Sequence, residues 1–383
     1  MNMKSQIRRA AGLLMLIGLS ACGFEDKTVG AESPLCLLLR EANVPRVKEA
    51  LEQGANPNGY CNYEYGGNYY ISKARISRPL LITALSGHSL EIARLLIHAG
   101  ADVNAPYSLD YPGGYPPLSL SVQAGDLPTT KLLLEKGADP NGRESLVPLN
   151  IALRSRRLDF LNLLLQFGAN PNATIPINKK LFHQLMETEY SFFKPAAEAM
   201  LGKGADINSK EDLSGRTPLH VTVEQSQFAD VVLKAQFLLN HGAKVNIQAK
   251  NGNSTLFEAS RSNSKYIPEL IKFLISRGAD VNLKGAANMT ILHQLVTNAH
   301  PEAPALIKQV IAIGANVNAQ DTKGNTPLHY LARASYENEI AKATLLLKSG
   351  ANLKIQNQAS QTPLDLAQEQ QDTELIKIFR KSR

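Results

Sequence analysis

Apolar and polar residues follow one another in fixed blocks between Gly314 and Gly350. Thr326-Pro327 opens the first block, because a hydroxyl caps free backbone N–H groups and proline suits the first turn of a helix. The apolar positions at helical spacing are Leu328, Leu331 and Ala332 in the first block and Ile340, Leu345, Leu346 and Leu347 in the second. Gly350 ends the second block, where helices often need a residue with positive φ. The pattern predicts two short helices followed by a polar loop that ends near Ser360.

The same blocks recur through most of the chain. A phrase of the form Gly-Ala-x-x-Asn, or a close variant, begins at Gly54, Gly100, Gly137, Gly168, Gly204, Gly242, Gly278, Gly314 and Gly350. The steps between these glycines are 46, 37, 31, 36, 38, 36, 36 and 36 residues. One such helix pair cannot bury its apolar face alone, so a repeat of this length predicts stacked units that share a continuous core.

The units resemble ankyrin repeats. Two of them carry the tetrad Thr-Pro-Leu-His, at 217–220 and 326–329, and each precedes a Gly-Ala-x-x-Asn phrase. Variants of the tetrad begin at Ser33, Arg78, Pro116, Val147, Lys180, Ser254, Thr290 and Thr362. The resemblance implies an all-α solenoid of about ten helix-turn-helix units with β-hairpin or loop fingers, over residues 33–383. Ankyrin repeats usually run 33 residues, so the longer units predict longer loops between helices, as at 260–268 and 297–304.

The first 21 residues have the pattern of a targeting segment. Lys4, Arg8 and Arg9 form a basic front, and the apolar run that follows is long enough for a signal sequence but too short to span a bilayer. The segment ends in Leu-Ser-Ala before Cys22, which resembles the lipidation box of bacterial lipoproteins; an ordinary signal peptide is the alternative. The resemblance implies lipidation of Cys22, a tether over residues 22–32, and anchoring at the outer membrane facing the periplasm, since Gly23 follows the cysteine.

Charge gives little support for a nucleic-acid partner. The formal net charge is +7, with 41 Lys and Arg residues against 34 Asp and Glu residues. Residues 1–21 contain three positive and no negative charges, so their removal leaves +4. This is mild for a chain of 383 residues, and we expect no nucleic-acid binding. We expect a monomer held at the membrane by its lipid anchor.

Two cysteines remain after Cys22. Cys36 takes the histidine position of the first tetrad, and Cys61 lies just beyond the first Gly-Ala-x-x-Asn phrase. An even pair in an oxidising compartment suggests a disulfide, provided that the two Cα atoms come within about 7 Å. Two separate buried thiols are the alternative.

Tyrosines gather in two enlarged fingers. Residues 59–77 and 105–116 are rich in glycine and interrupt the repeat rhythm, which indicates loops or hairpins. The tyrosines that they contain are Tyr60, Tyr63, Tyr65, Tyr69, Tyr70, Tyr107, Tyr111 and Tyr115. Tyrosine buries a large apolar area while it keeps a polar group, so we expect these residues to bind a partner protein. The alternative is that they pack on one another to hold the two loops in place.

No catalytic pattern is visible. Four histidines occupy the tetrad position, where the ring typically bonds loop backbone: His183, His220, His293 and His329. No histidine pair has the close helical spacing of a zinc site, and no nucleophile elbow, P-loop or dinucleotide fingerprint occurs. We expect a non-enzymatic protein without a metal or cofactor.

The long concave surface of such a solenoid is suited to gripping another protein. Fold alone does not name that protein. Three roles stay open: an immunity or inhibitor lipoprotein that neutralises an envelope-targeted toxin, an accessory factor of an envelope stress-defence enzyme, and a structural spacer.

Overall fold

The structure is a computed structural model that describes residues 32–65, 74–105, 115–142, 147–175, 179–225, 229–333 and 338–382. Its first helices are α2 (Pro34–Arg40), α4 (Leu80–Ser86), α6 (Pro117–Ala124), α8 (Pro148–Arg154), α10 (Leu181–Gln184) with the 3₁₀ turn η2 (Leu185–Glu187), α12 (Pro218–Glu224), α14 (Thr255–Ser260), α16 (Ile291–Thr297), α18 (Pro327–Leu331) and α20 (Pro363–Glu369). Its second helices are α3 (Val44–Glu52), α5 (Leu90–His98), α7 (Leu127–Glu135), α9 (Leu158–Gln166), α11 (Tyr190–Leu201), α13 (Val231–Asn240), α15 (Ile267–Ser276), α17 (Ala303–Ala312), α19 (Glu339–Lys348) and α21 (Thr373–Lys381).

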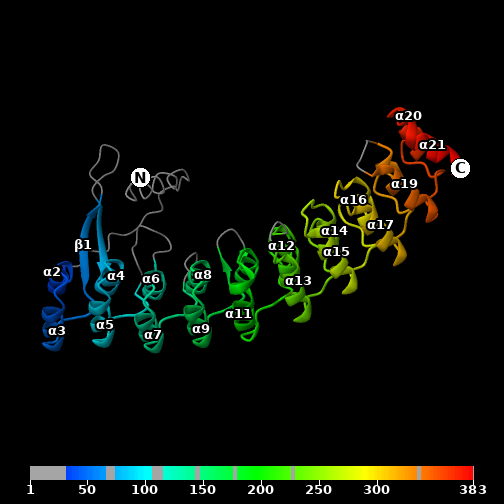
Figure 1. Cartoon of the computed structure of the whole chain (residues 1–383). Coiled ribbons are helices and arrows are strands. Elements are labelled where there is room, and N and C mark those ends of the chain that lie inside the picture. The colour runs from blue at the N-terminus through cyan, green and yellow to red at the C-terminus, as the bar shows by residue number, and fades with distance from the viewer. Residues whose placement is uncertain are drawn as a thin grey trace.

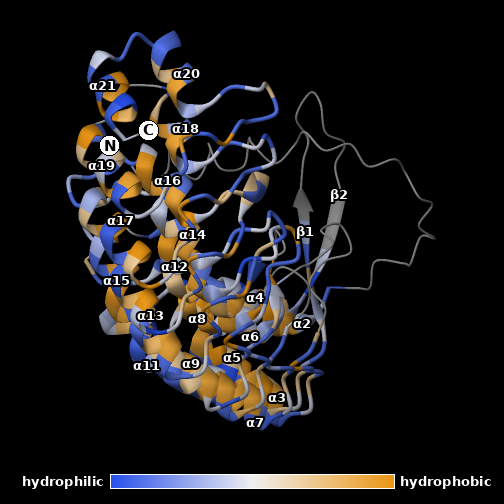
Figure 2. Cartoon of the chain, turned by 90° about the vertical axis from the view of Figure 1, so that its right-hand side faces the viewer, coloured by the Kyte–Doolittle hydropathy of each residue, from blue (hydrophilic) through white to orange (hydrophobic). Residues whose placement is uncertain are grey.

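The helix pairs stack side by side in chain order, as the repeat pattern predicts. Figure 1 shows the pairs in a row from α2 to α21, with the later pairs following a curve. Figure 2 shows the second helices along one side of the stack and the connecting fingers along the other, with the first helices between them. The described residues form a mostly helical solenoid with two short sheets, β1 (Tyr60–Tyr65) with β2 (Ala74–Pro79) and β3 (Thr174–Ile175) with β4 (Lys179–Lys180).

The tetrad explains how a first helix begins and how it holds the next unit. The Nδ1 atom of His329 accepts a hydrogen bond from the backbone N–H of Thr326 at 3.0 Å, and the Thr326 side chain caps the helix in return. The Nε2 atom of the same ring lies 3.0 Å from the carbonyl oxygen of Gln361 in the following finger. Because Nδ1 accepts, Nε2 carries the proton and donates it. One neutral ring therefore satisfies a helix N-terminus and joins two units.

The asparagine of the Gly-Ala-x-x-Asn phrase joins the units a second time. The Asn282 side chain donates to the carbonyl oxygen of Gly314 at 2.9 Å and accepts from the backbone N–H of Asn316 at 2.8 Å. The asparagines that make the same pair of bonds are Asn58, Asn104, Asn172, Asn208, Asn246, Asn282 and Asn318. This ladder explains why asparagine recurs in the sequence, since a shorter or apolar side chain cannot make both bonds.

Replacing Gly278 by valine should destabilise the stack through backbone strain alone. Gly278 has a φ of 83°, and a Cβ atom added there meets no other atom within 4 Å. We expect the free energy of unfolding to fall by about 1–2 kcal/mol in urea titrations. Gly278→Asn is the control, since asparagine tolerates this conformation far better than a β-branched residue does. Equal losses in the two variants would contradict the assignment of strain.

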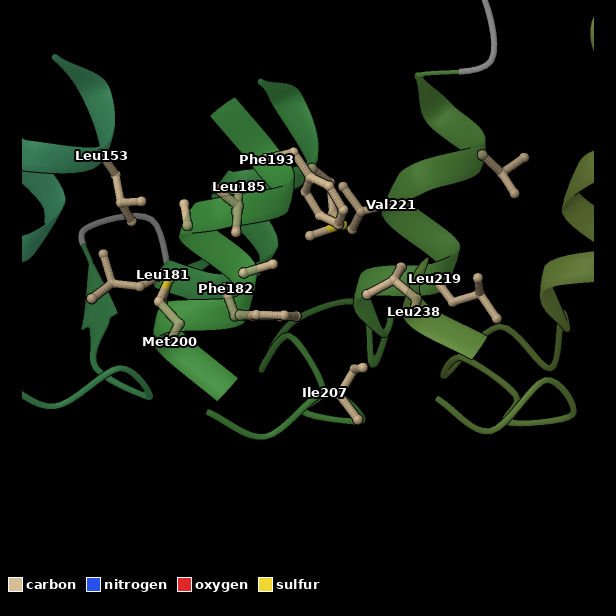
Figure 3. Close-up of a cluster of buried hydrophobic side chains, with 14 of the residues drawn as sticks. Leu153, Leu181, Phe182, Leu185, Phe193, Met200, Ile207, Leu219, Val221 and Leu238 are labelled. Atoms are coloured by element: carbon tan, nitrogen blue, oxygen red, sulfur yellow. The ribbon is translucent and has the colours of Figure 1, made fainter. Parts of the chain in front are cut away.

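The fifth unit has a bulkier core than its neighbours. Phe182, Phe193 and Met200 are almost completely buried, and the Phe193 ring packs edge-on against Phe237 of the next unit, with ring centroids 5.1 Å apart. Figure 3 shows the Phe193 ring beside Val221 of the next unit, and Met200 beside Leu181. Helix α11 continues through Pro195. Dense apolar packing of α11 offsets the hydrogen bond that proline cannot donate.

Candidate protein-binding surface

The most pronounced departure from the repeat is the hairpin of β1 and β2. The two strands pair antiparallel from Tyr60 opposite Pro79 to Tyr65 opposite Ala74. Figure 1 shows this hairpin rising well beyond the first helices of neighbouring units. The stack does not need this extension, because later units, such as those joined between α13 and α14 or between α15 and α16, are connected without a long hairpin.

A disulfide bond fixes the end of the hairpin that joins the stack, which we call its root, to the first helix. It joins Cys36 of α2 to Cys61 of β1, with the two Cα atoms 5.3 Å apart. Both residues are fully buried in the core of the first units. Strand β1 therefore cannot swing away from α2 while the bond is intact.

Thiol labelling tests this bond. Under denaturing, non-reducing conditions, we expect neither Cys36 nor Cys61 to react with a maleimide probe. After reduction both should react, and the free energy of unfolding should fall by roughly 2–4 kcal/mol, as for other disulfides that close loops of similar length. Two reactive thiols before reduction would contradict the pairing.

Two arginines hold the hairpin root from the sides. The guanidinium carbons of Arg40 and Arg78 lie 5.2 Å and 4.9 Å from the centroid of the Tyr63 ring. Arg40 also donates to the carbonyl oxygen of Asn62 at 2.7 Å and pairs with Glu32 at 2.7 Å. Cation–π contacts of this kind stabilise an aromatic ring in one orientation. This cluster was not predicted from the sequence, although Arg78, in the first position of its tetrad, was a signal for it.

Because side chains alternate between the two faces of a strand, Tyr60 and Tyr63 lie on opposite faces of β1. Tyr60 is 44% exposed, whereas Tyr63 is half-buried against the arginines on the opposite face of β1. Tyr115 lies two residues before α6 and is 37% exposed. Tyr65 ends β1. The predicted site residues that lie outside the described residues are Tyr69, Tyr70, Tyr107, Tyr111 and Cys22.

Tyr60 borders a hollow between neighbouring fingers. The hollow has a volume of about 140 Å³ and lies between the root of the hairpin and the next turn, which contains Asp102 and Ala105. Pro79 and the buried Leu81 form part of its wall. An exposed aromatic ring beside a small, partly apolar hollow is a suitable contact for a side chain of a protein partner.

The four tetrad histidines form hydrogen bonds between neighbouring units. In His183, His220, His293 and His329, burial lowers the pKa below its ordinary value, to about 4 for His220, so the rings are neutral at neutral pH. Each of them places Nε2 within 3.2 Å of a carbonyl oxygen of the following unit. In the part of the chain that the structure describes, no group of three His, Cys, Asp or Glu side chains could hold a metal ion.

The fifth tetrad departs from this arrangement. Lys180 stands where four later units have threonine, and the Nδ1 atom of His183 has no hydrogen-bond partner among the described residues. A hollow of about 380 Å³ opens beside it, lined in part by Lys180, Phe182, Ser209 and Lys210. Both acidic and basic side chains border this hollow, so its lining favours neither an anionic nor a cationic ligand.

Stacked helix pairs joined by fingers, with a neutral histidine in the tetrad, define a helical repeat protein. A family model described as ankyrin repeats (3 copies) matches residues 80–175, 188–285, 265–357 and 292–382, which together exceed half of the chain. The chain belongs to the ankyrin-repeat family. Ankyrin repeats generally bind other proteins and are generally non-enzymatic. Within the described ranges, no helix is long and apolar enough to cross a membrane.

Proposed function

We propose that this ankyrin-repeat protein is a lipoprotein of the bacterial envelope that binds another protein in the periplasm. The lipidation box before Cys22 supports the anchor, and residues 22–32 provide the tether between lipid and repeats. The observation that carries the binding function is the pinned hairpin. A disulfide and two arginines fix the root of an element that the stack does not require.

The tyrosine-rich fingers form the proposed partner site. Because the root of the hairpin is held in place, the protein loses less entropy when the finger binds a partner. The aromatic side chains of the finger can then contribute more of their contact energy to affinity. Tyr60 and Tyr115 expose large apolar surface at the two fingers. The partner contacts Tyr60 and Tyr115. Tyr63, which packs against Arg40 and Arg78, keeps the first finger in place.

A triple substitution tests the partner site. Replacing Tyr65, Tyr69 and Tyr111 by alanine should weaken partner binding by several kcal/mol if two or more are hot spots, with little change in melting temperature. The partner is first isolated by cross-linking in the native envelope, and its affinity is then measured with purified proteins. The control instead removes exposed apolar side chains in or directly after second helices: Leu233, Ile313 and Ile340 to alanine. Unchanged affinity in the tyrosine variant would place the site elsewhere.

The anchor is tested separately. Cys22→Ser should abolish fatty-acid incorporation and release the protein from the outer-membrane fraction or leave it unprocessed. A Cys22→Ser protein that still incorporates labelled fatty acid would contradict the lipoprotein proposal. This outcome would leave the partner site on the fingers untouched.

Neighbouring genes separate the two more specific roles. A neighbouring gene for a secreted lipase or nuclease toxin favours an immunity lipoprotein, and the isolated toxin should then lose activity when the purified repeat domain is added. A neighbouring catalase gene favours an accessory role in stress defence. Deletion of the repeat protein should then lower the envelope activity of that enzyme.

A further inference from the structure

The hollow of about 380 Å³ in the fifth unit lies between two consecutive fingers. We call it the fifth-unit hollow. Its lining residues are Pro171, Asn172, Lys180 and Phe182 on one wall and Asp206, Ser209, Lys210 and Asp212 on the other. Figure 1 shows α11, the second helix of this unit, near the middle of the row and away from β1. The hollow is therefore separate from the tyrosine-rich fingers of the first units.

Hydrogen bonds between the two walls hold the fifth-unit hollow open. The Asn172 side chain donates to the carbonyl oxygen of Gly204 at 2.8 Å and accepts from the backbone N–H of Asp206 at 2.7 Å. The His183 ring, which follows the first wall in the chain, places Nε2 at 2.9 Å from the carbonyl oxygen of Arg216. The walls are thus joined before and after the hollow. Sites for small molecules are usually formed in advance in this way.

The fifth unit leaves polar atoms unsatisfied where a complete tetrad would not. In a complete tetrad, the backbone N–H of Thr326 donates to Nδ1 of His329 at 3.0 Å. Lys180 takes the threonine position in the fifth unit, and Nδ1 of the fully buried His183 has no partner among the described residues. The buried Oγ atom of Ser209 has none either. Unsatisfied buried groups lower stability, so a lysine retained at this position points to a role beyond the stack.

The charges around the fifth-unit hollow are balanced but incompletely paired. Nζ of Lys180 lies 3.6 Å from Oδ1 of Asp212, which is longer than the roughly 2.7–2.9 Å of a charge-assisted hydrogen bond. The Asp206 carboxylate borders the hollow and forms no ion pair with another described residue. Lys210 adds a second positive charge, and its Nζ atom bonds a neutral carbonyl group. Charges of both signs are therefore available to a ligand.

We propose that the fifth-unit hollow binds a free α-amino acid with an apolar side chain. Such a molecule carries an ammonium and a carboxylate group on one carbon atom, so its opposite charges lie close together, as those of Lys180 and Asp212 do. Its carboxylate accepts from Lys180, and its ammonium donates to Asp212 and Asp206. Its apolar side chain packs against Pro171 and Phe182, which line the same space.

The size and the charge balance of the hollow both favour this ligand. Sites for small molecules have volumes of about 300–1,000 Å³, and the fifth-unit hollow lies at the lower end of that range. A ligand with only negative charge would face the carboxylates of Asp206 and Asp212. A ligand with only positive charge would face the ammonium groups of Lys180 and Lys210. A small zwitterion can pair with both signs at once.

Three related compounds test the charge requirement by calorimetric titration of the purified protein. L-leucine carries both charges, N-acetyl-L-leucine lacks the ammonium group, and L-leucinamide lacks the carboxylate. We expect L-leucine to bind about tenfold more tightly than either of the other two, because each of them loses one charge-assisted contact. Absence of binding by L-leucine, or equal binding of the three compounds, would overturn the proposal.

Lys180→Thr separates ligand binding from folding. This variant should bind L-leucine about tenfold more weakly than the parent. Its melting temperature should stay equal or rise, because threonine completes the tetrad and gives Nδ1 of His183 a donor. The control is Lys203→Thr, since Lys203 is an exposed lysine of the same unit that does not line the hollow. Parent-like binding of L-leucine by Lys180→Thr would overturn the proposal.

Asp206→Asn provides a second variant that keeps the finger intact. Asparagine retains the oxygen that accepts from the backbone N–H of Asn208 at 2.9 Å, but it removes the negative charge. Asp280→Asn is the matched control, because Asp280 makes the same bond to Asn282 in a later finger. We expect weaker binding of L-leucine only in Asp206→Asn, and equal binding by the two variants would contradict the site. The tyrosine variant should bind L-leucine like the parent, so this test is independent of the partner site.

Discussion

The free energy of unfolding should fall by about 2 kcal/mol between about pH 7 and about pH 5, because of His220 alone. Burial of His220 lowers its pKa from 6.5 to about 4. The unfolded chain therefore takes up a proton near pH 6.5, while the folded protein keeps the ring neutral. The stability from this ring is fully present above the unfolded pKa and is lost as the pH falls toward the folded pKa.

The other buried rings should add to this loss. Burial also lowers the pKa of His183, His293 and His329. Protonation requires Nδ1 to lose its role as acceptor, and at His293 that atom accepts from the backbone N–H of Thr290 at 3.0 Å. Because each ring joins two units, several units should loosen together in mild acid.

Urea titrations at the two pH values measure the effect. His220→Gln should be less stable than the parent at about pH 7 but should lose less stability on acidification. His98→Gln is the control, since His98 is exposed at the end of α5. An identical pH dependence in parent and His220→Gln would contradict this account, because ordinary carboxylates titrate mostly below pH 5.

The repeat was predictable because it depends on local chemistry. Thr326-Pro327 begins a helix, and Gly278 and Gly350 end helices with positive φ, whatever the neighbouring units contain. The family match bears out the ankyrin resemblance. The number of units and the lipid anchor stay predictions.

The contacts between units were less predictable, because they join residues far apart in the chain. Arg40 and Arg78 meet on Tyr63 only when β1 lies beside α2. Helix propensity is local, whereas the packing that overrides it at Pro195 comes from neighbouring units.

A buried lysine supplies the second large effect: Lys342→Ala should lower the free energy of unfolding by about 3–5 kcal/mol. Lys342 lies in α19 and is fully buried. Its Nζ atom donates to the carbonyl oxygens of Val296 at 3.1 Å and Asn298 at 2.8 Å, at the C-terminal end of α16 in the preceding unit. Helix C-termini have carbonyl groups without intrahelical donors, and this ammonium satisfies two of them.

Lys342→Met separates the two parts of that effect. Methionine keeps much of the apolar stem, so its loss should be limited to the hydrogen bonds, about 1–3 kcal/mol, whereas alanine also leaves a cavity. Lys348→Ala is the control, since Lys348 is exposed on the same helix and should change stability by no more than about 0.5 kcal/mol. Hydrogen exchange should show the loosening concentrated around α16 to α19. If alanine and methionine were equally stable and close to the parent, the ammonium would contribute nothing to the junction, and the carbonyl groups of α16 would need another donor.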